Sequence, residues 1–407
     1  MTERVRLEIT GLAHGGEGLG RREERVIFVP FSAPGDLVVA QIVQEGRGWA
    51  RGRLLEVVRP SADRVAPPCP HFGVCGGCQL QHIAYPAQLR AKHEVFRDQL
   101  GRLSRLRGVS VQPVKGMVEP WHYRNMAYLY PTPTGELGIK AGGHRYPAAV
   151  DSCPLFHPLI DELFTALELD IEGIRRIGLR AGVRTGDQMV ILEIYGDEAP
   201  ELEVDMPISI VLARQNGDIQ VLAGDQAIWE EVAGRRLRIS ATSVFPANTD
   251  MAEQMTQHIQ RALALSGNEK VVDAGCGVGL FSLTLGTLAG LIGIDDNPWA
   301  VADFLDNARG APWVGAIEAT LSAGLAEIND AVDVAIAHPP RAGLGENGAQ
   351  ELARLKPRRL IYLADDPAVL ARDADGLLEA GYRLVEVQPF DLLPQTYQTP
   401  AIALWER

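Results

Sequence analysis

Four of the five cysteines in this 407-residue chain have the spacing of a metal centre. Cys69, Cys75 and Cys78 lie within CPHFGVCGGC, and Cys153 follows far downstream in DSCPL. Four soft thiolates suit a [4Fe-4S] cluster, and the glycine pair before Cys78 permits a tight turn. Zinc is an alternative, although four-cysteine zinc sites usually combine two C-x2-C pairs and only one is present. Two disulfides would need an oxidising compartment, for which the polar start MTERVRLEIT gives no secretory signal.

A second candidate site is a glycine-rich turn in the first part of the region 241–407. The segment KVVDA runs into GCGVGLF, and a second apolar run, GLIGID, ends in an acidic residue about 20 positions later, where doubly wound sheets bind ribose hydroxyls. Dinucleotide enzymes use similar turns, but the Pro-Pro that ends a later strand in HPPRAGLG favours S-adenosylmethionine. The predicted cofactor-binding residues are Asp273, Gly275, Cys276, Gly277, Gly279, Phe281 and Asp295.

Charge is distributed unevenly along a chain whose net charge is −13. Residues 1–110 hold 16 Lys and Arg against 11 Asp and Glu, whereas residues 241–407 hold 11 against 22. This asymmetry favours a polyanion at the basic end and a small molecule at the acidic end, with incidental surface charge as the alternative. No run of about 18 apolar residues predicts a membrane span, so we expect a cytoplasmic protein, and we expect it to be a monomer.

Three regions must position these residues, which predicts a multi-domain α/β protein. In residues 1–60, short strands alternate with glycine-rich turns and predict an OB-like β-barrel. Residues 61–240 predict a mixed α+β central domain that carries the metal site. After the cysteine segment it has an amphipathic helix in YPAQLRAKHEVFRDQLGRL and then strands in MAYLYPTP, LGIKAG, MVILEIYG, ISIVLAR and IQVLAG. Residues 241–407 alternate strands and helices, which predicts a Rossmann-like sheet with a helix from Leu280 and an antiparallel final pair of strands. Barrel arginines expected to reach a phosphate backbone are Arg21, Arg22, Arg47, Arg51 and Arg53.

Together these segments resemble the iron-sulfur class of RNA uracil-5 methyltransferases. The resemblance covers nearly the whole chain and rests mainly on CPHFGVCGGCQLQHIAYPAQLRAK, with WHYRNMAYLY, VVDAGCGVGLFSL, HPPRAGL, YLADDPAVLARD and LLPQTYQTPAIALW. It implies a TRAM barrel, a [4Fe-4S] central domain and a class I methyltransferase domain. The implied activity is methylation of carbon 5 of a uridine in structured RNA, with ribosomal RNA preferred over transfer RNA as the expectation.

The chain departs from that family at the residues that carry its chemistry. Family members add a cysteine thiolate to carbon 6 of the base and remove the carbon-5 proton with a glutamate. When the motifs are matched, Asp365 stands in place of the cysteine and Pro400 in place of the glutamate. His338 replaces the aspartate that opens the Asp-Pro-Pro-Arg turn. Cys276 is the one thiol outside the cysteine cluster, and its expected role is packing.

Two functions therefore remain open. In the first, the chain is a methyltransferase that acts on an exocyclic amine or ring nitrogen, where orientation replaces the thiolate and Asp365 and His338 are the candidate catalytic residues. In the second, it is a catalytically silent RNA-binding paralogue. Chemistry at the cluster itself is disfavoured, because four cysteines would leave no open iron.

Overall fold

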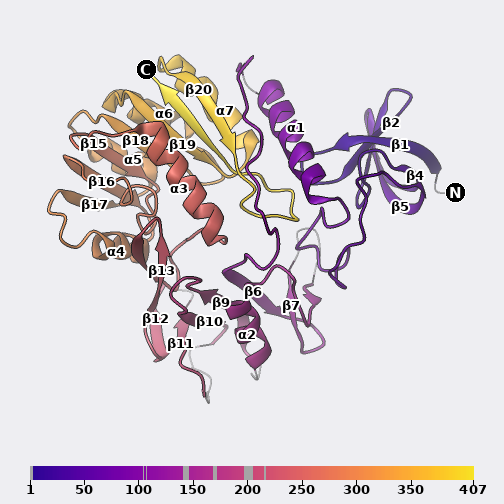
Figure 1. Cartoon of the computed structure of the whole chain (residues 1–407), viewed down its shortest axis with the longest axis horizontal. Helices are drawn as coiled ribbons and strands as arrows, with labels where there is room; N and C mark the ends of the chain where they lie inside the picture. Colours follow the sequence, from indigo (N-terminus) through magenta and orange to yellow (C-terminus); the bar gives the residue numbers. More distant parts are fainter. Residues whose placement is uncertain are drawn as a thin grey trace.

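The computed structural model describes residues 3–103, 105–106, 108–140, 146–167, 172–196, 205–214 and 217–407. Figure 1 shows three bodies, with the amino-terminal barrel on the right, the carboxyl-terminal sheet on the left and a mixed sheet below them. None of the helices in these ranges is long and apolar enough to cross a membrane.

The amino-terminal body is a closed five-stranded barrel in the order β1-β2-β3-β5-β4. Burial along β1 alternates, so that Val5, Leu7 and Ile9 point into the barrel while their neighbours face solvent. This confirms the barrel expected from the alternating sequence. Its strands are β1 (Arg4–Leu12), β2 (Gly18–Arg22), β3 (Arg25–Val29), β4 (Leu37–Gly46) and β5 (Trp49–Arg59).

The central body is a mixed seven-stranded sheet in the order β12-β11-β10-β9-β6-β7-β8, with helix α2 (Pro158–Ala166) against it. The sequence patterns predicted β6, β7, β10, β11 and β12, but they did not predict β8, β9 or α2. The strand expected in LGIKAG is present as β7, and residues 141 and 142 of that segment lie outside the described ranges. The strands are β6 (Met126–Pro131), β7 (Leu137–Ile139), β8 (Ala148–Ala149), β9 (Ile174–Ala181), β10 (Gln188–Ile194), β11 (Ser209–Ala213) and β12 (Ile219–Ala223).

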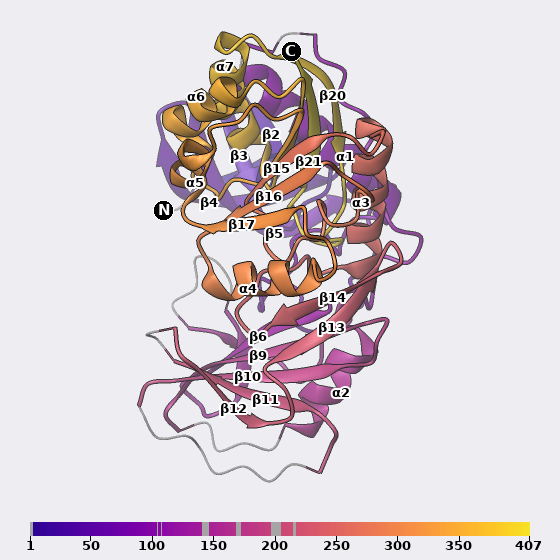
Figure 2. The same cartoon turned by 90° about the vertical axis from the view of Figure 1, so that its left-hand side faces the viewer.

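The carboxyl-terminal body is a seven-stranded sheet in the order β17-β16-β15-β18-β19-β21-β20, parallel except for β21. This order confirms the Rossmann-like sheet and its antiparallel closing pair. A hairpin of β13 (Ala227–Val232) and β14 (Arg235–Ser240) lies between it and the central sheet (Figure 2). The strands are β15 (Lys270–Ala274), β16 (Gly290–Asp295), β17 (Val314–Glu318), β18 (Val334–Ala337), β19 (Arg359–Ala364), β20 (Arg383–Pro389) and β21 (Ala401–Glu406).

Helices cover both faces of this sheet, so that its central strands β15, β18 and β19 are almost fully buried, while the edge strand β17 is not. On one face lie α5 (Leu321–Glu327), α6 (Gly345–Leu355) and α7 (Pro367–Glu379), and on the other lie α3 (Thr249–Leu263) and α4 (Pro298–Asn307).

The helix predicted in YPAQLRAKHEVFRDQLGRL is present as α1 (Tyr85–Leu103). Its buried residues Phe96 and Leu100 belong to the core of the carboxyl-terminal sheet, and the helix packs against α7. The division of the chain at residues 60 and 240 stays a prediction, and this packing argues for grouping α1 with the carboxyl-terminal body. Figure 1 shows α1 between that body and the barrel.

The prediction of a helix that begins at Leu280 is wrong. Residues 280–284 form turns, with Leu283 N–H donating to Gly279 O at 2.9 Å. The segment that links the glycine turn to β16 contains two threonines and Gly286, which has a φ of 92°. Threonine and glycine both disfavour helix, and so short a segment gains little from helical propagation.

Candidate functional site

The predicted cofactor residues gather where β15 and β16 end. Asp295 Oδ2 accepts a hydrogen bond from Gly277 N–H at 2.9 Å, which ties the acidic residue to the glycine turn. A Cβ at Gly275 would lie 2.3 Å from His338 O, and one at Gly279 would collide with Leu283, so packing explains both of these glycines. At Gly277 the nearest atom to a Cβ is Val244 O at 3.7 Å. Gly277 is thus the glycine of this turn with space in front of it.

Beneath the glycine turn lies a buried carboxylate with an unsatisfied oxygen. Asp273 is 2% exposed, and its Oδ2 has no hydrogen-bond partner among the described residues. Burial raises its pKa to about 7, although the neighbouring hydroxyl of Ser282 acts in the opposite direction. An unpaired buried carboxyl oxygen is costly, which fits a site that awaits a polar ligand.

Two predicted cofactor residues are packing residues. Cys276 is buried, and a Cβ on Gly293 would lie 2.9 Å from its sulfur. Burial also raises the pKa of the Cys276 thiol, which keeps it protonated. Phe281 belongs to the core on the α3 face of the sheet. The packing role expected for Cys276 agrees with this arrangement.

The two candidate catalytic residues form a pair at the carboxyl ends of β18 and β19. His338 Nε2 lies 3.3 Å from Asp365 Oδ1. Burial lowers the pKa of His338, but the hydrogen bond and charge of Asp365 outweigh it, so the pKa is raised. The pKa of Asp365 is lowered, because the interactions with His338 outweigh its burial. The pair can accept a proton from a group placed beside it.

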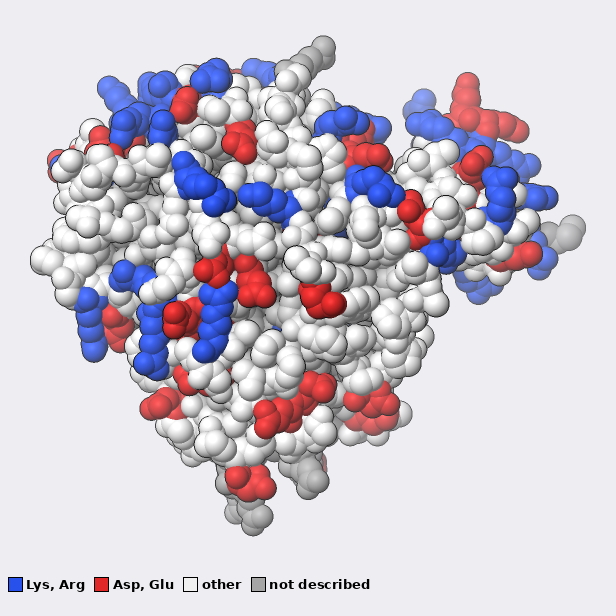
Figure 3. All heavy atoms as spheres, viewed as in Figure 1, with Lys and Arg blue, Asp and Glu red and all other residues white. Residues whose placement is uncertain are grey.

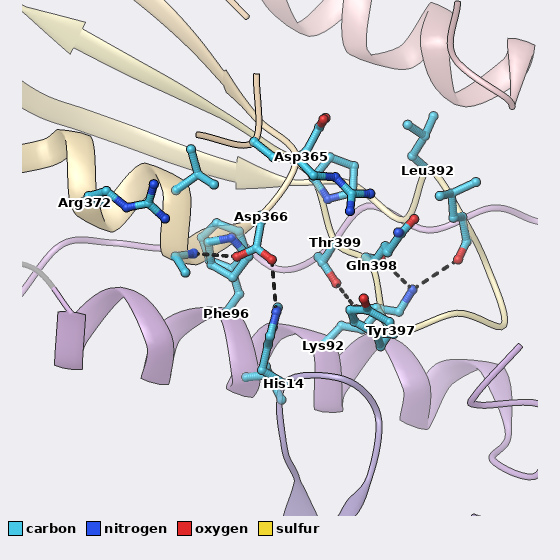
Figure 4. Close-up of a pocket in the computed structure, with 17 residues that line it drawn as sticks. His14, Lys92, Phe96, Asp365, Asp366, Arg372, Leu392, Tyr397, Gln398 and Thr399 are labelled. Carbon is cyan, nitrogen blue, oxygen red and sulfur yellow. Dashed lines mark hydrogen bonds and ion pairs between the residues drawn. The ribbon is translucent and has the colours of Figure 1, made fainter. Parts of the chain in front are cut away.

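Asp365 lines a cavity of about 390 Å³ (Figure 4). The cavity lies between the barrel, α1, α7 and residues 391–400, a segment that we call the pocket loop. The cavity includes Pro400, so the two positions that the sequence comparison matched to the family's cysteine and glutamate line the same space. No cysteine is among the described residues that line it. The lining also contains Phe96, Arg341, Asp366, Arg372, Tyr397, Gln398 and Thr399.

Two cavity residues were missed in the sequence, because they come from distant segments. His14, in the loop between β1 and β2, lies 3.0 Å from Asp366 Oδ2 and edge-on to Tyr397 (Figure 4). Lys92 of α1 forms a buried ion pair with Asp391 and donates to Gln398 O at 3.1 Å. No local sequence signal could have identified His14, whereas a lysine in the line of buried residues of α1 was a usable sign that it has a buried partner.

All four predicted metal cysteines line one small cavity beside the central sheet. They are free thiols in the structure, which does not support the disulfide alternative. No three His, Cys, Asp or Glu side chains in the described ranges converge as the ligands of a metal ion. The structure thus places the four cysteines around one cavity, whereas a metal in this cavity stays a prediction.

The buried groups around the cysteine cavity are compatible with a bound metal centre. Burial raises the pKa of Cys78 to about 12, with a hydrogen bond from Gln81 and the charge of Arg124 acting in the opposite direction. Arg124 lines the same cavity, and its buried Nε lacks a hydrogen-bond partner within the described chain. A buried cation is costly beside neutral thiols, because nothing offsets its charge. The cost falls if the sulfurs bind a metal as thiolates.

The barrel arginines named in the sequence analysis are all exposed. Several have acidic or polar partners, because Arg22 bonds to Glu3 and Arg51 to Glu17. Figure 3 shows this mixture of basic and acidic side chains over the barrel at the upper right. Exposed ion pairs of this kind are weak and are readily exchanged for phosphate contacts.

Comparisons with known proteins agree with this architecture. Residues 2–55 match the TRAM domain. The chain is 34% identical to an RNA methyltransferase of Thermosynechococcus vestitus, over 98% of this chain and 97% of that protein. It is 30% identical to the 23S rRNA (uracil(1939)-C(5))-methyltransferase RlmD of Shewanella amazonensis, over 100% of this chain and 96% of that protein.

A solved structure matches over nearly the full length. It is the Pyrococcus abyssi tRNA (uracil-54, C5)-methyltransferase in complex with S-adenosyl-L-homocysteine, with 25% identity and a TM-score of 0.79. The alignment covers 98% of this chain and 100% of that one. The order of the barrel, the mixed sheet and the Rossmann-like sheet is thus shared with a known RNA-modifying enzyme.

Proposed function

The chain belongs to the RNA methyltransferase family whose members include uracil-C5 enzymes, and from this premise we propose that it methylates RNA without a thiolate nucleophile. The proposed target is an exocyclic amine or a ring nitrogen of a base in structured RNA, with ribosomal RNA preferred over transfer RNA. Such an atom attacks a methyl donor directly, so the site needs orientation and a proton acceptor.

The observation that carries this proposal is the pairing of His338 with Asp365, a residue that lines the cavity of about 390 Å³. The cavity is large enough for a base taken out of its stack, which enzymes that modify bases require. Asp365 and His338 would accept the proton that the nitrogen loses. A carboxylate is a poor nucleophile toward carbon 6 of uracil, so the same residues do not support the thiolate route.

The residues around Gly277 would hold S-adenosylmethionine, with Asp295 at its ribose. The unsatisfied oxygen of Asp273 and the open space at Gly277 support this placement. When bound, the cofactor supplies an electrophilic methyl group on a sulfonium. The amine or ring nitrogen would attack that methyl carbon, so that a nitrogen–carbon bond forms as the carbon–sulfur bond breaks and S-adenosylhomocysteine leaves.

For the cysteine cavity, we propose a [4Fe-4S] cluster ligated by Cys69, Cys75, Cys78 and Cys153. Its support is that the four cysteines line one small cavity together with the buried guanidinium of Arg124, whose Nε lacks a hydrogen-bond partner among the described residues and whose charge would offset that of a thiolate-bound cluster. The exposed arginines of the barrel would contact the RNA backbone.

A catalytically silent RNA-binding paralogue is the second candidate. It is favoured by Pro400, which provides no proton acceptor in its side chain at the position where the uracil-5 enzymes have a glutamate. In that case the cavity would hold a base and leave it unmodified.

The test is to incubate the purified protein with methyl-labelled S-adenosylmethionine and unmodified total RNA, and then to analyse the nucleosides. Label in an N-methylated nucleoside is expected, and Asp365→Asn should abolish it. Asp375→Asn, an aspartate on α7 outside the cavity, is the matched control. Label in 5-methyluridine would overturn the proposed target. The absence of label with RNA retained on the protein would favour the silent paralogue.

A further inference from the structure

The cysteine segment and the pocket loop are joined directly by hydrogen bonds. Immediately after Cys78, the backbone N–H groups of Gln79 and Leu80 both donate to Gln395 O, each at 3.0 Å. The side chain of Gln79 adds two contacts, because its Oε1 accepts from Tyr397 N–H at 3.4 Å and its Nε2 donates to Gly76 O at 2.8 Å. Gln79 therefore bridges the cysteine segment and the pocket loop.

Gln395 is held in an unfavourable backbone conformation at this junction. Its φ is 70°, in the left-handed region that is unfavourable for a residue other than glycine. It is 2% exposed, and its Oε1 accepts from Gln88 Nε2 of α1 at 2.9 Å. A strained residue persists only where its surroundings over-determine it, so the contacts from Gln79, Leu80 and Gln88 maintain this conformation.

Gln395 lies just before the residues that form one wall of the cavity. Tyr397, Gln398, Thr399 and Pro400 begin two residues after Gln395 and line the space beside Asp365. A second link runs in parallel, because Tyr123 OH donates to Pro394 O at 2.9 Å and the next residue after Tyr123 lines the cysteine cavity. Two connections thus run from the cysteine cavity to one short segment of the pocket loop.

We infer that Gln79 and Leu80 are positioning residues that make the shape of the nucleotide cavity depend on the state of the cysteine segment. The inference rests on the proposed role of that cavity in binding a base. When the four cysteines are held together, the Gln79–Leu80 backbone presents its two N–H groups to Gln395. When the cysteines are oxidised or lose their ligand, the segment shifts, and Gln395 can relax and withdraw Tyr397 from the cavity.

Hydrogen exchange of the full-length, anaerobically purified protein tests this coupling without RNA or cofactor. Gln79→Ala should make the amides of residues 391–400 exchange about tenfold faster, because the pocket loop loses one of its anchors. Cys78→Ser should give the same effect in the pocket loop, although Cys78 does not line the cavity. Gln398→Ala is the matched control, since it truncates a cavity side chain for which no bond to the cysteine segment is seen.

Equal exchange in the pocket loop for the parent and Gln79→Ala would overturn the inference, as would an equal acceleration in Gln398→Ala. If Cys78→Ser does not fold, the comparison of the two glutamine variants still decides the outcome. Because exchange requires no methyl transfer, this experiment can fail while the proposed activity stands, and it can succeed in a silent paralogue.

Discussion

The imidazole of His14 in the barrel lies 3.0 Å from the carboxylate of Asp366, which caps the amino end of α7 by accepting a hydrogen bond from Ala368 N–H. This contact fixes the barrel loop over the cavity beside Asp365 (Figure 4). An RNA-binding module and the candidate catalytic segment therefore share one ion pair, and the barrel forms part of the cavity wall.

The His14–Asp366 contact should make stability depend on pH. The hydrogen bond to Asp366 raises the pKa of His14, and the same contact overcomes burial to lower the pKa of Asp366. The stabilisation from His14 is therefore full below its unfolded pKa of about 6.5 and is lost as pH rises through the higher folded value. Since both side chains are about one-third exposed, we expect less than about 1 kcal/mol.

Urea unfolding of the parent and of His14→Gln measures this effect. The difference between them should be larger at pH 5.5 than at pH 8.5, because at the higher pH the imidazole is neutral. On the acidic side the contribution of Asp366 disappears as pH falls through its lowered pKa. A difference that does not change with pH would show that His14 acts by packing alone.

The buried ion pair under the pocket loop should be important for stability. Lys92 is 3% exposed and Asp391 is fully buried, so Lys92→Met would strand a buried carboxylate and cost about 3–5 kcal/mol. The double variant Lys92→Met with Asp391→Leu should recover much of that loss, because it removes both charges. Chemical denaturation of the three proteins provides the comparison, and an additive loss in the double variant would contradict the ion-pair explanation.

Iron content tests the cysteine cavity. Protein purified without oxygen should be brown and contain about four irons per chain, since four thiolates complete a [4Fe-4S] cluster. Cys153→Ser should lose the colour and destabilise the central domain, whereas Cys276→Ser should keep the iron because Cys276 packs in the cofactor turn. Stoichiometric zinc without iron would contradict the cluster.

Cofactor binding should depend on Asp295. Asp295→Ala should weaken binding of S-adenosylmethionine by about 1–3 kcal/mol, because it removes charge-assisted hydrogen bonds to the ribose. Part of this loss would come from the turn itself, since Asp295 also accepts from Gly277 N–H. Asp295→Asn keeps an acceptor for that turn and should lose less. Titration calorimetry that detects no binding at millimolar cofactor would rule out a methyltransferase role.

RNA that contains 5-fluorouridine separates the thiolate route from the proposed one. Enzymes that use a cysteine nucleophile are trapped by this base, because fluorine at carbon 5 cannot leave as a proton does. With Asp365 in the cavity, we expect no adduct that survives denaturation, while non-covalent RNA binding weakens steeply as salt rises. Asp365→Cys tests the position, since it places a thiol where an adduct can form. An adduct in the parent that Cys276→Ala abolishes would contradict our assignment.

Local patterns in the sequence determined most of the elements. Each pattern involves residues only a few positions apart. Examples are the alternation in β1, the amphipathic spacing in α1 and the apolar runs of β15, β16 and β19. The position of Asp365 after β19 and of Asp295 at the end of β16 also followed, because the carboxyl ends of parallel strands share one edge.

Only the tertiary structure decided what meets at that edge. The contacts His14–Asp366, Lys92–Asp391 and Gln79–Gln395 join residues that are hundreds of positions apart. No period or local propensity encodes such pairs, because they form when separate bodies pack and each buried polar group must find a partner. For the same reason, the sequence predicted that α1 is a helix but did not predict which body it packs against.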